Sequence, residues 1–190
     1  YDKLVIATGS VPFILPVPGK ELPGVITYRD LDDVQAMLLA AQSREKAVVI
    51  GGGLLGLEAA AGLVGRGMDV TVLHVMPTLM ERQLDPAAGY LLQKELERRG
   101  IKVLCKANTK AIVGNGKVEG IELDDGRIIP ATLVVMAVGI RPSVGLAKDA
   151  GIAVNRGIVV DDGMLTSDGS IMALGECAEV HGMVYGLVAP

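Results

Sequence analysis

The fold is decided by the stretch Val48-Val49-Ile50-Gly51-Gly52-Gly53-Leu54-Leu55-Gly56-Leu57-Glu58. Gly51, Gly53 and Gly56 form a G-x-G-x-x-G pattern that follows a short apolar strand and opens an Ala-rich helix. The pattern alone is weak, but a second apolar strand follows at 70–73, as the βαβ dinucleotide-binding unit requires. No Gly-Lys-Ser/Thr sequence accompanies it, which excludes a P-loop.

Each glycine of the pattern has its own expected task. Gly51 permits the tight turn, Gly53 lets the backbone approach a pyrophosphate, and Gly56 lets the helix pack closely on the strand. The helix start, with Leu54 and Leu55, offers free N–H groups and a positive dipole end to the phosphates. We predict that this turn binds NAD or NADP; a purely structural turn, or another nucleotide-like ligand, is the alternative.

The acidic residue expected about 20 residues further on, where it would bind the ribose 2′-hydroxyl of NAD, is missing. The strand ends instead at Leu73-His74-Val75, and no Arg stands nearby to hold a 2′-phosphate. His74 can hydrogen-bond a hydroxyl or, when protonated, a phosphate, or it merely ends a strand. Glu58 either favours the helix dipole or points into a cofactor cleft. The choice between NAD and NADP stays open.

Around this unit, strands and helices alternate. Residues 11–26 carry four prolines and predict an irregular connector. Asn115-Gly116 and Asp124-Asp125-Gly126 predict turns of an antiparallel meander over 109–130. The other expected elements are strands at 4–8, 47–50, 101–105 and 133–137, and helices at 34–41 after an Asp30 cap, at 57–67, and at 86–99 after an Asp85 cap. The fold class is therefore α/β, with a Rossmann-type three-layer NAD(P)-binding domain and a β meander.

Composition excludes several function classes. The 190 residues carry a net charge of −4 without a basic run, which gives no footprint for nucleic acid or an anionic membrane. The apolar runs are shorter than the roughly 20 residues of a membrane helix. Cys105 and Cys177 form no C-x-x-C pair, so we expect neither a disulfide nor a redox dithiol, and a reduced, cytoplasmic location. The sequence has no His-rich cluster that would predict a metal site and no Ser-His-Asp pattern that would predict hydrolysis.

An internal echo suggests how the chain is divided. Residues 7–12 and residues 137–142 both close an apolar strand with Ala-x-Gly-x-x-Pro, and the two copies bracket the glycine-rich unit. Strands often end in Gly and Pro, which is the simpler explanation. The sharper one is a domain inserted at 27–140, between flanks at 1–26 and 141–190.

These motifs together resemble the FAD-dependent pyridine nucleotide–disulfide oxidoreductase superfamily over essentially the whole chain. Residues 2–10 resemble its first Ala-Thr-Gly signature, 46–133 its inserted NAD(P)H domain, 137–139 the second crossing, and 170–178 the signature whose acid binds the flavin ribityl chain. Residues 76–85 and 175–190, with His74 where relatives place Glu, are most similar to the assimilatory NAD(P)H-nitrite reductase branch. Rubredoxin and ferredoxin reductases are the near neighbours.

The resemblance implies NAD(P)H and FAD as cofactors, with hydride passing from the nicotinamide to the flavin and electrons onward to metal centres. It places Glu58 at the nicotinamide carboxamide, Gly139 beside the nicotinamide, Thr8, Gly9 and Arg29 near the flavin, and Glu176, in place of the usual Asp, at the ribityl chain. Because the cofactors carry that chemistry, we expect no general acid, base or nucleophile from this chain.

The resemblance also implies parts that the sequence lacks. The βαβ unit that binds the ADP part of FAD is expected before Tyr1, and iron–sulfur and sirohaem ligands far downstream. We expect an excised, inactive fragment with incomplete FAD-domain flanks, which binds NAD(P)H weakly and FAD hardly at all. Strands at 3–8 and 170–174 would then pair with each other or mediate a homodimer. A thiol–disulfide reductase fragment and a non-catalytic dinucleotide sensor are the alternatives.

Overall fold

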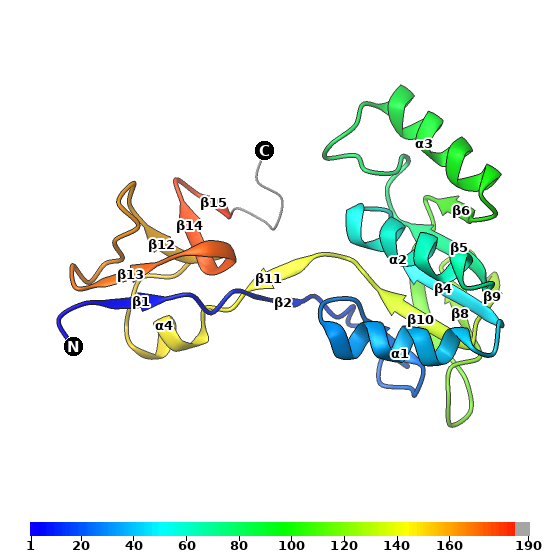
Figure 1. The fold of residues 1–190 in the computed structure, drawn as a ribbon, viewed down its shortest axis with the longest axis horizontal. Helices are drawn as coiled ribbons and strands as arrows, with labels where there is room; N and C mark the ends of the chain where they lie inside the picture. The colour runs from blue at the N-terminus through cyan, green and yellow to red at the C-terminus, as the bar shows by residue number, and fades with distance from the viewer. Residues whose placement is uncertain (185–190) are drawn as a thin grey trace. The chain divides into compact units, whose positions relative to one another are not determined.

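The computed structural model describes residues 1–184. These residues form two compact units, a larger one from Pro12 to Gly139 and a smaller one built from residues 1–11 and 140–184 (Figure 1). The segment 12–26 packs inside the larger unit, where the carbonyl oxygens of Pro18 and Pro23 accept hydrogen bonds from the meander, at 2.8 and 2.9 Å. The division into 1–26, 27–140 and 141–190 as domains of a longer protein stays a prediction.

A five-stranded parallel sheet forms the centre of the larger unit. Its strands, in spatial order, are β3 (Val25–Thr27), β10 (Leu133–Met136), β4 (Lys46–Ile50), β5 (Asp69–His74) and β6 (Lys102–Cys105). Every pairing in this sheet is parallel, which confirms the predicted α/β class. The expectation that residues 11–26 are irregular was wrong at both ends of this range, where β2 (Ser10–Pro12) and β3 form, because strands of three residues show no periodicity.

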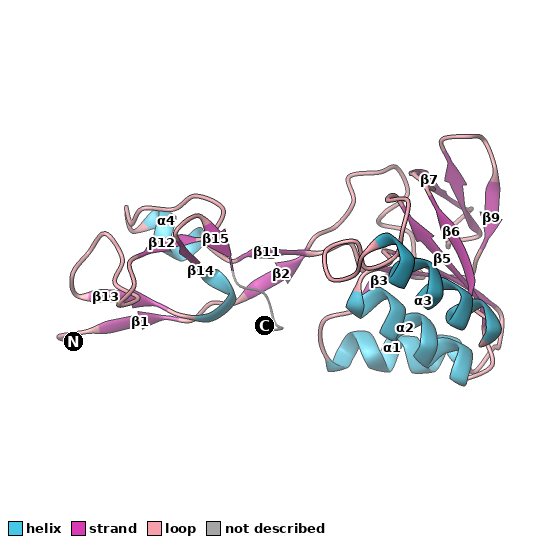
Figure 2. Ribbon diagram, turned by 90° about the horizontal axis from the view of Figure 1, so that it is seen from above, coloured by secondary structure: helices cyan, strands magenta, loops and turns pink. Residues whose placement is uncertain are grey.

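The sheet separates two layers (Figure 2). The helices are α1 (Leu31–Ala41), α2 (Leu54–Gly65) and α3 (Pro86–Arg98), and the meander strands are β7 (Thr109–Val113), β8 (Gly120–Leu123) and β9 (Ile128–Pro130). Along β4, Ala47 and Val49 pack with the helices, whereas Val48 and Ile50 pack with the meander. Because alternate residues of a strand face opposite ways, an unbroken apolar run fills both cores. The predicted three-layer arrangement is confirmed.

Local signals explain where the helices begin. The Asp85 carboxylate accepts a hydrogen bond from the Ala88 N–H at 2.8 Å and caps α3, and Asp30 caps α1 in a capping box with Asp33. The predicted start of α2 at Leu57 was wrong. The helix begins at Leu54, immediately after Gly53, because the second half of the glycine pattern already has helical conformation.

The smaller unit contains short strands around its own core. Strand β1 (Leu4–Ile6) pairs in parallel with β13 (Ile171–Ala173), which confirms the first of the two outcomes expected for these segments. The remaining elements are β2 (Ser10–Pro12) with β11 (Ile140–Pro142), β12 (Ile158–Val160) with β14 (Ala178–Val180) and β15 (Met183–Val184), the helix α4 (Gly145–Asp149) and the short helix η1 (Gly175–Cys177). Of the stretch 175–190 that resembles nitrite reductases, residues 185–190 lie outside the described part.

Candidate functional site

The glycine turn occupies the carboxyl end of β4, beside the ends of β5 and β10. Gly51 has φ +123°, and a Cβ at this position would lie 2.1 Å from the Ala137 carbonyl oxygen, which follows β10. Its N–H donates to the Leu73 carbonyl at 2.8 Å. Only glycine satisfies this backbone conformation and this close approach. The turn therefore lies where open α/β sheets bind ligands, beyond the carboxyl ends of the strands.

The start of α2 presents uncapped backbone donors. Gly53 is the N-cap residue, and because it has no side chain it makes no side-chain capping hydrogen bond to this helix end. A Cβ at Gly53 would meet nothing within 4 Å, so the protein itself leaves open the space that a side chain would fill. The first-turn N–H groups, including those of Leu54 and Leu55, have no partner inside the helix. They fit an anionic group such as a pyrophosphate.

Gly56 is constrained by packing instead. A Cβ there would lie 2.0 Å from the Gly51 carbonyl oxygen and 3.4 Å from the Cβ of Ala137. The absence of a side chain lets α2 approach the turn closely enough to direct its first N–H groups over the strand end.

His74, the last residue of β5, is 7% exposed and uses both ring nitrogens. Its Nδ1 lies 3.1 Å from the Gly52 nitrogen, and its Nε2 lies 3.0 Å from Glu81 Oε2. The imidazole thus joins the glycine turn to the loop after β5. Sequence reasoning missed Glu81, because nothing in its spacing indicates that the loop folds back.

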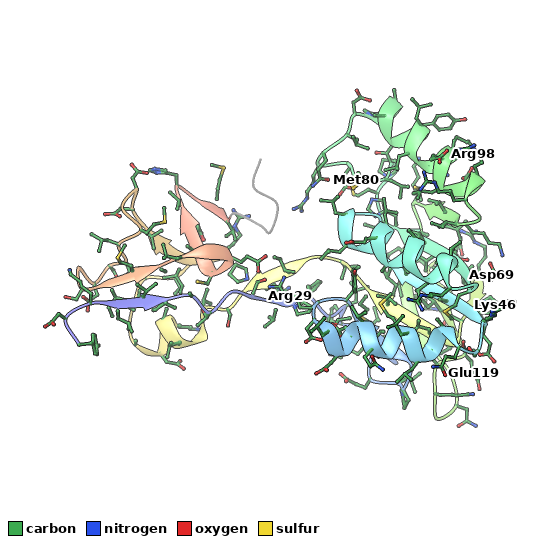
Figure 3. The ribbon with its side chains drawn as sticks, viewed as in Figure 1. Arg29, Lys46, Asp69, Met80, Arg98 and Glu119 are labelled. Atoms are coloured by element: carbon green, nitrogen blue, oxygen red, sulfur yellow. The ribbon has the colours of Figure 1, made fainter. Side chains whose placement is uncertain are left out.

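Three predicted site residues lie near this edge of the sheet. Glu58 is exposed on α2 and lies near Tyr28. The pKa of the Tyr28 hydroxyl is raised, first by the partial burial of Tyr28 and second by the negative charge of Glu58. Arg29, labelled in Figure 3, follows Tyr28, and its backbone N–H donates to Asp33 Oδ2 at 2.7 Å. Gly139, beyond β10, has φ +111°, and a Cβ added there would meet nothing within 4 Å, so this backbone is accessible. Tyr28 carried no motif that could have marked it.

The smaller unit brings together the other predicted residues. Gly9 has φ +64°, and the Thr8 hydroxyl donates to the Ser143 carbonyl at 2.7 Å. The Ser10 hydroxyl donates to Glu176 Oε2, also at 2.7 Å. The half-buried Glu176 is therefore oriented beside the backbone of the first Ala-Thr-Gly segment.

Neither cysteine is placed for redox chemistry within the described chain. Cys177 is buried in the smaller unit, and Cys105 lies at the end of β6 in the larger one. The pKa of the Cys105 thiol is raised, mainly by its burial and to a lesser extent by the negative charge of Glu97, and this disfavours the reactive thiolate. Across residues 1–184, no group of three or more His, Cys, Asp or Glu side chains could hold a metal, and no helix is long and apolar enough to cross a membrane.

Comparison with known proteins places these features in a family. The model of the pyridine nucleotide-disulphide oxidoreductase family matches residues 1–188. The chain belongs to this family. Its fold is correspondingly close to that of a ferredoxin reductase from Rhodopseudomonas palustris, with a TM-score of 0.91 and 36% identity over 95% of this chain and 45% of that one.

Two family members from Bacillus subtilis (strain 168) are similar over the whole chain. A nitrite reductase [NAD(P)H] is 58% identical over 190 residues, which is 100% of this chain and 24% of that protein. An assimilatory nitrate reductase electron transfer subunit is 53% identical over 190 residues, 100% of this chain and 25% of that protein. The chain therefore spans about a quarter of the length of these relatives.

Proposed function

We propose that the larger unit binds NAD(P)H and that, in a longer protein of the nitrite reductase type, it presents the nicotinamide to FAD. The observation that carries this proposal is the start of α2, where uncapped N–H groups face a space that Gly53 leaves open. A pyrophosphate fits this place by charge and by hydrogen bonding. The 58% identity to a nitrite reductase [NAD(P)H] supports the choice of parent enzyme.

The two cofactors supply hydride transfer, and this chain supplies binding and orientation. Gly51, Gly53 and Gly56 shape the pyrophosphate site, with Leu54 and Leu55 as donors. Glu58, exposed at the same edge of the sheet as Tyr28, would accept a hydrogen bond from the nicotinamide carboxamide. Gly139, with its open backbone, would border the nicotinamide ring.

The smaller unit would contribute contacts to FAD. Glu176 is held by the Ser10 hydroxyl next to Thr8 and Gly9, so its carboxylate is positioned to accept hydrogen bonds from the hydroxyls of a ribityl chain. Arg29 would lie near the flavin. Iron–sulfur and sirohaem centres belong, in this proposal, to parts of the longer protein outside these 190 residues.

A glycine-to-alanine pair tests the proposal in the full-length protein that carries this chain. Gly53→Ala is expected to weaken NADH binding at least about tenfold, because the methyl group enters the space reserved for the pyrophosphate. Gly62→Ala lies in the same helix, also with nothing within 4 Å of its Cβ, and is expected to bind NADH normally. Titration of each variant with NADH and NADPH measures both effects. Equal affinity in the two variants would reject the site.

The reaction assignment needs its own measurement. The full-length protein is expected to oxidise NADH or NADPH with nitrite as the acceptor. A protein that binds the nucleotide and reduces its flavin, but does not consume nitrite, would retain the binding site and lose the nitrite reductase assignment.

Two further expectations concern the whole protein. Two cysteines without a C-x-x-C pair favour a cytoplasmic location. A homodimer stays a prediction, although β1 already pairs with β13 within the chain, and light scattering of the full-length protein tests it.

A further inference from the structure

The loop between β5 and α3 is fastened to the glycine turn at several points. The Met80 N–H donates to the Gly52 carbonyl at 3.0 Å. Leu79 is fully buried, and a Cβ on Gly52 would come within 2.6 Å of its side chain. Met80 adopts φ +54°, a backbone conformation rare outside glycine and maintained here by these contacts. The chain is thereby reversed immediately before Glu81 (Met80 is labelled in Figure 3).

His74 completes this arrangement through its tautomer. The backbone N–H of Gly52 can only donate, so Nδ1 accepts and the ring proton resides on Nε2. That proton points at Glu81 Oε2, 3.0 Å away. Both ring nitrogens are thus engaged within the protein, and the imidazole has no nitrogen left for a ribose hydroxyl. The Glu81 side chain, in contrast, is 31% exposed and retains acceptor capacity.

We infer that Glu81 is the residue that recognises the adenosine ribose, and that His74 is a positioning residue that holds it there; the inference rests on the proposed NAD(P)H site. In dinucleotide-binding units a carboxylate at the end of the second strand binds the ribose 2′-hydroxyl. This chain has an imidazole at that strand end and a carboxylate hydrogen-bonded to it. The carboxylate therefore comes from the loop after β5 and not from the strand end, and His74 lies between it and the glycine turn.

The chemistry of this acid determines which dinucleotide the site accepts. A carboxylate accepts hydrogen bonds from a free 2′-hydroxyl, and such charge-assisted bonds are among the stronger ones. The same carboxylate repels a 2′-phosphate, since both groups are negative. Glu81 therefore selects NAD over NADP, a choice that the strand-end residue alone left open.

Calorimetric titration of the full-length, FAD-loaded protein with NAD⁺ and with NADP⁺ tests this without turnover. Glu81→Gln keeps the shape of the side chain but removes its charge, and is expected to lower the ratio of NAD⁺ to NADP⁺ affinity by about tenfold or more. Glu81→Arg is expected to favour NADP⁺. Glu119→Gln removes an exposed carboxylate before β8, labelled elsewhere in the same unit in Figure 3, and is expected to leave the ratio unchanged.

His74→Asn isolates the positioning role. The Asn oxygen can still accept the Gly52 N–H, but its side chain is too short to reach Glu81. The affinity ratio is expected to move in the same direction as in Glu81→Gln, by a smaller factor, which a merely structural residue would not cause.

Two results overturn the inference. Unaltered protein that binds NADP⁺ as tightly as NAD⁺, or a Glu81→Gln variant that keeps its ratio, removes Glu81 from ribose recognition while the dinucleotide site stands. Failure of the unaltered protein to bind either nucleotide removes the proposed function, and this assignment with it.

Discussion

Two glycine-to-alanine substitutions in helix α2 are expected to change stability in opposite directions. At Gly56 the new Cβ would lie 2.0 Å from the Gly51 carbonyl oxygen. An ordinary contact between carbon and oxygen is roughly 3.3 Å or longer, so the helix or the turn must retreat by roughly 1.3 Å. At Gly62, in the same helix, the new methyl group meets nothing within 4 Å.

The magnitudes follow from these distances. Overpacking of this kind costs about 1–3 kcal/mol, because both the clashing carbonyl and the helix belong to the backbone and cannot change rotamer. Alanine in place of glycine in an open helical position stabilises by about 0.5–1 kcal/mol. For a chain of this size each kcal/mol shifts the unfolding temperature by roughly 2–4 °C. Gly56→Ala should therefore unfold several degrees lower, and Gly62→Ala about 1–4 °C higher, than the unaltered protein.

Thermal unfolding followed by far-ultraviolet circular dichroism measures both variants under one set of conditions. Because both residues lie in α2, helix propensity affects both, and the contact with Gly51 affects only one. If Gly56→Ala were as stable as Gly62→Ala, the third glycine of the motif would not be required by packing, and the reasoning from the Cβ distance would fail.

Two further predictions concern other elements. Asp30→Ala removes the side chain that accepts the N–H groups of Asp32 and Asp33, and should lower the free energy of unfolding by about 1 kcal/mol in urea titrations, whereas Asp32→Ala leaves the cap intact. Glu179 accepts hydrogen bonds from the Gly157 N–H and the Asn155 amide, and these bonds lower the pKa of its carboxyl group. The ionised carboxylate therefore stabilises the fold at pH values above the ordinary pKa of a glutamate. This contribution is lost as the pH falls below about 4. Glu179→Gln should flatten the dependence of unfolding temperature on pH in that acid range; an unchanged profile would contradict this origin of the pKa shift.

Local patterns account for the part of the fold that the sequence predicted. Unbroken apolar runs give buried parallel strands, Asn115-Gly116 lies in the connection between the antiparallel strands β7 and β8, and Asp85 before Pro86 gives a helix start. Each of these signals acts within a few residues, so it can be found without knowing the tertiary contacts. Strand β3 escaped because three residues at an edge carry no period, and the start of α2 because its glycines indicate a turn.

The candidate site likewise has a part that local sequence predicts and a part that depends on tertiary contacts. The glycine turn is encoded by contiguous residues and could be predicted, whereas the contact between His74 and Glu81 depends on a chain reversal at Met80. A positive φ at a methionine follows from the packing of Leu79 and the hydrogen bond to Gly52, and neither is visible in the order of the residues. The same limit applies to the proximity of Glu58 and Tyr28.

The structure gives a physical reason for the repeated Ala-x-Gly-x-x-Pro pattern at 7–12 and 137–142, beyond the general tendency of strands to end in Gly and Pro. Gly9 and Gly139 occupy corresponding places in the two copies, and both have positive φ, at +64° and +111°. The segments that follow them, β2 and β11, pair with each other. The chain therefore enters and leaves the segment between the copies through adjacent strands. This pairing fits the prediction of an inserted domain, because a segment whose two ends lie together adds little loop-closure entropy to the rest of the chain. The repeated Ala-x-Gly-x-x-Pro pattern reflects this shared geometry. In each copy the chain ends a strand, turns at a glycine with positive φ and then forms a strand that pairs with the strand of the other copy.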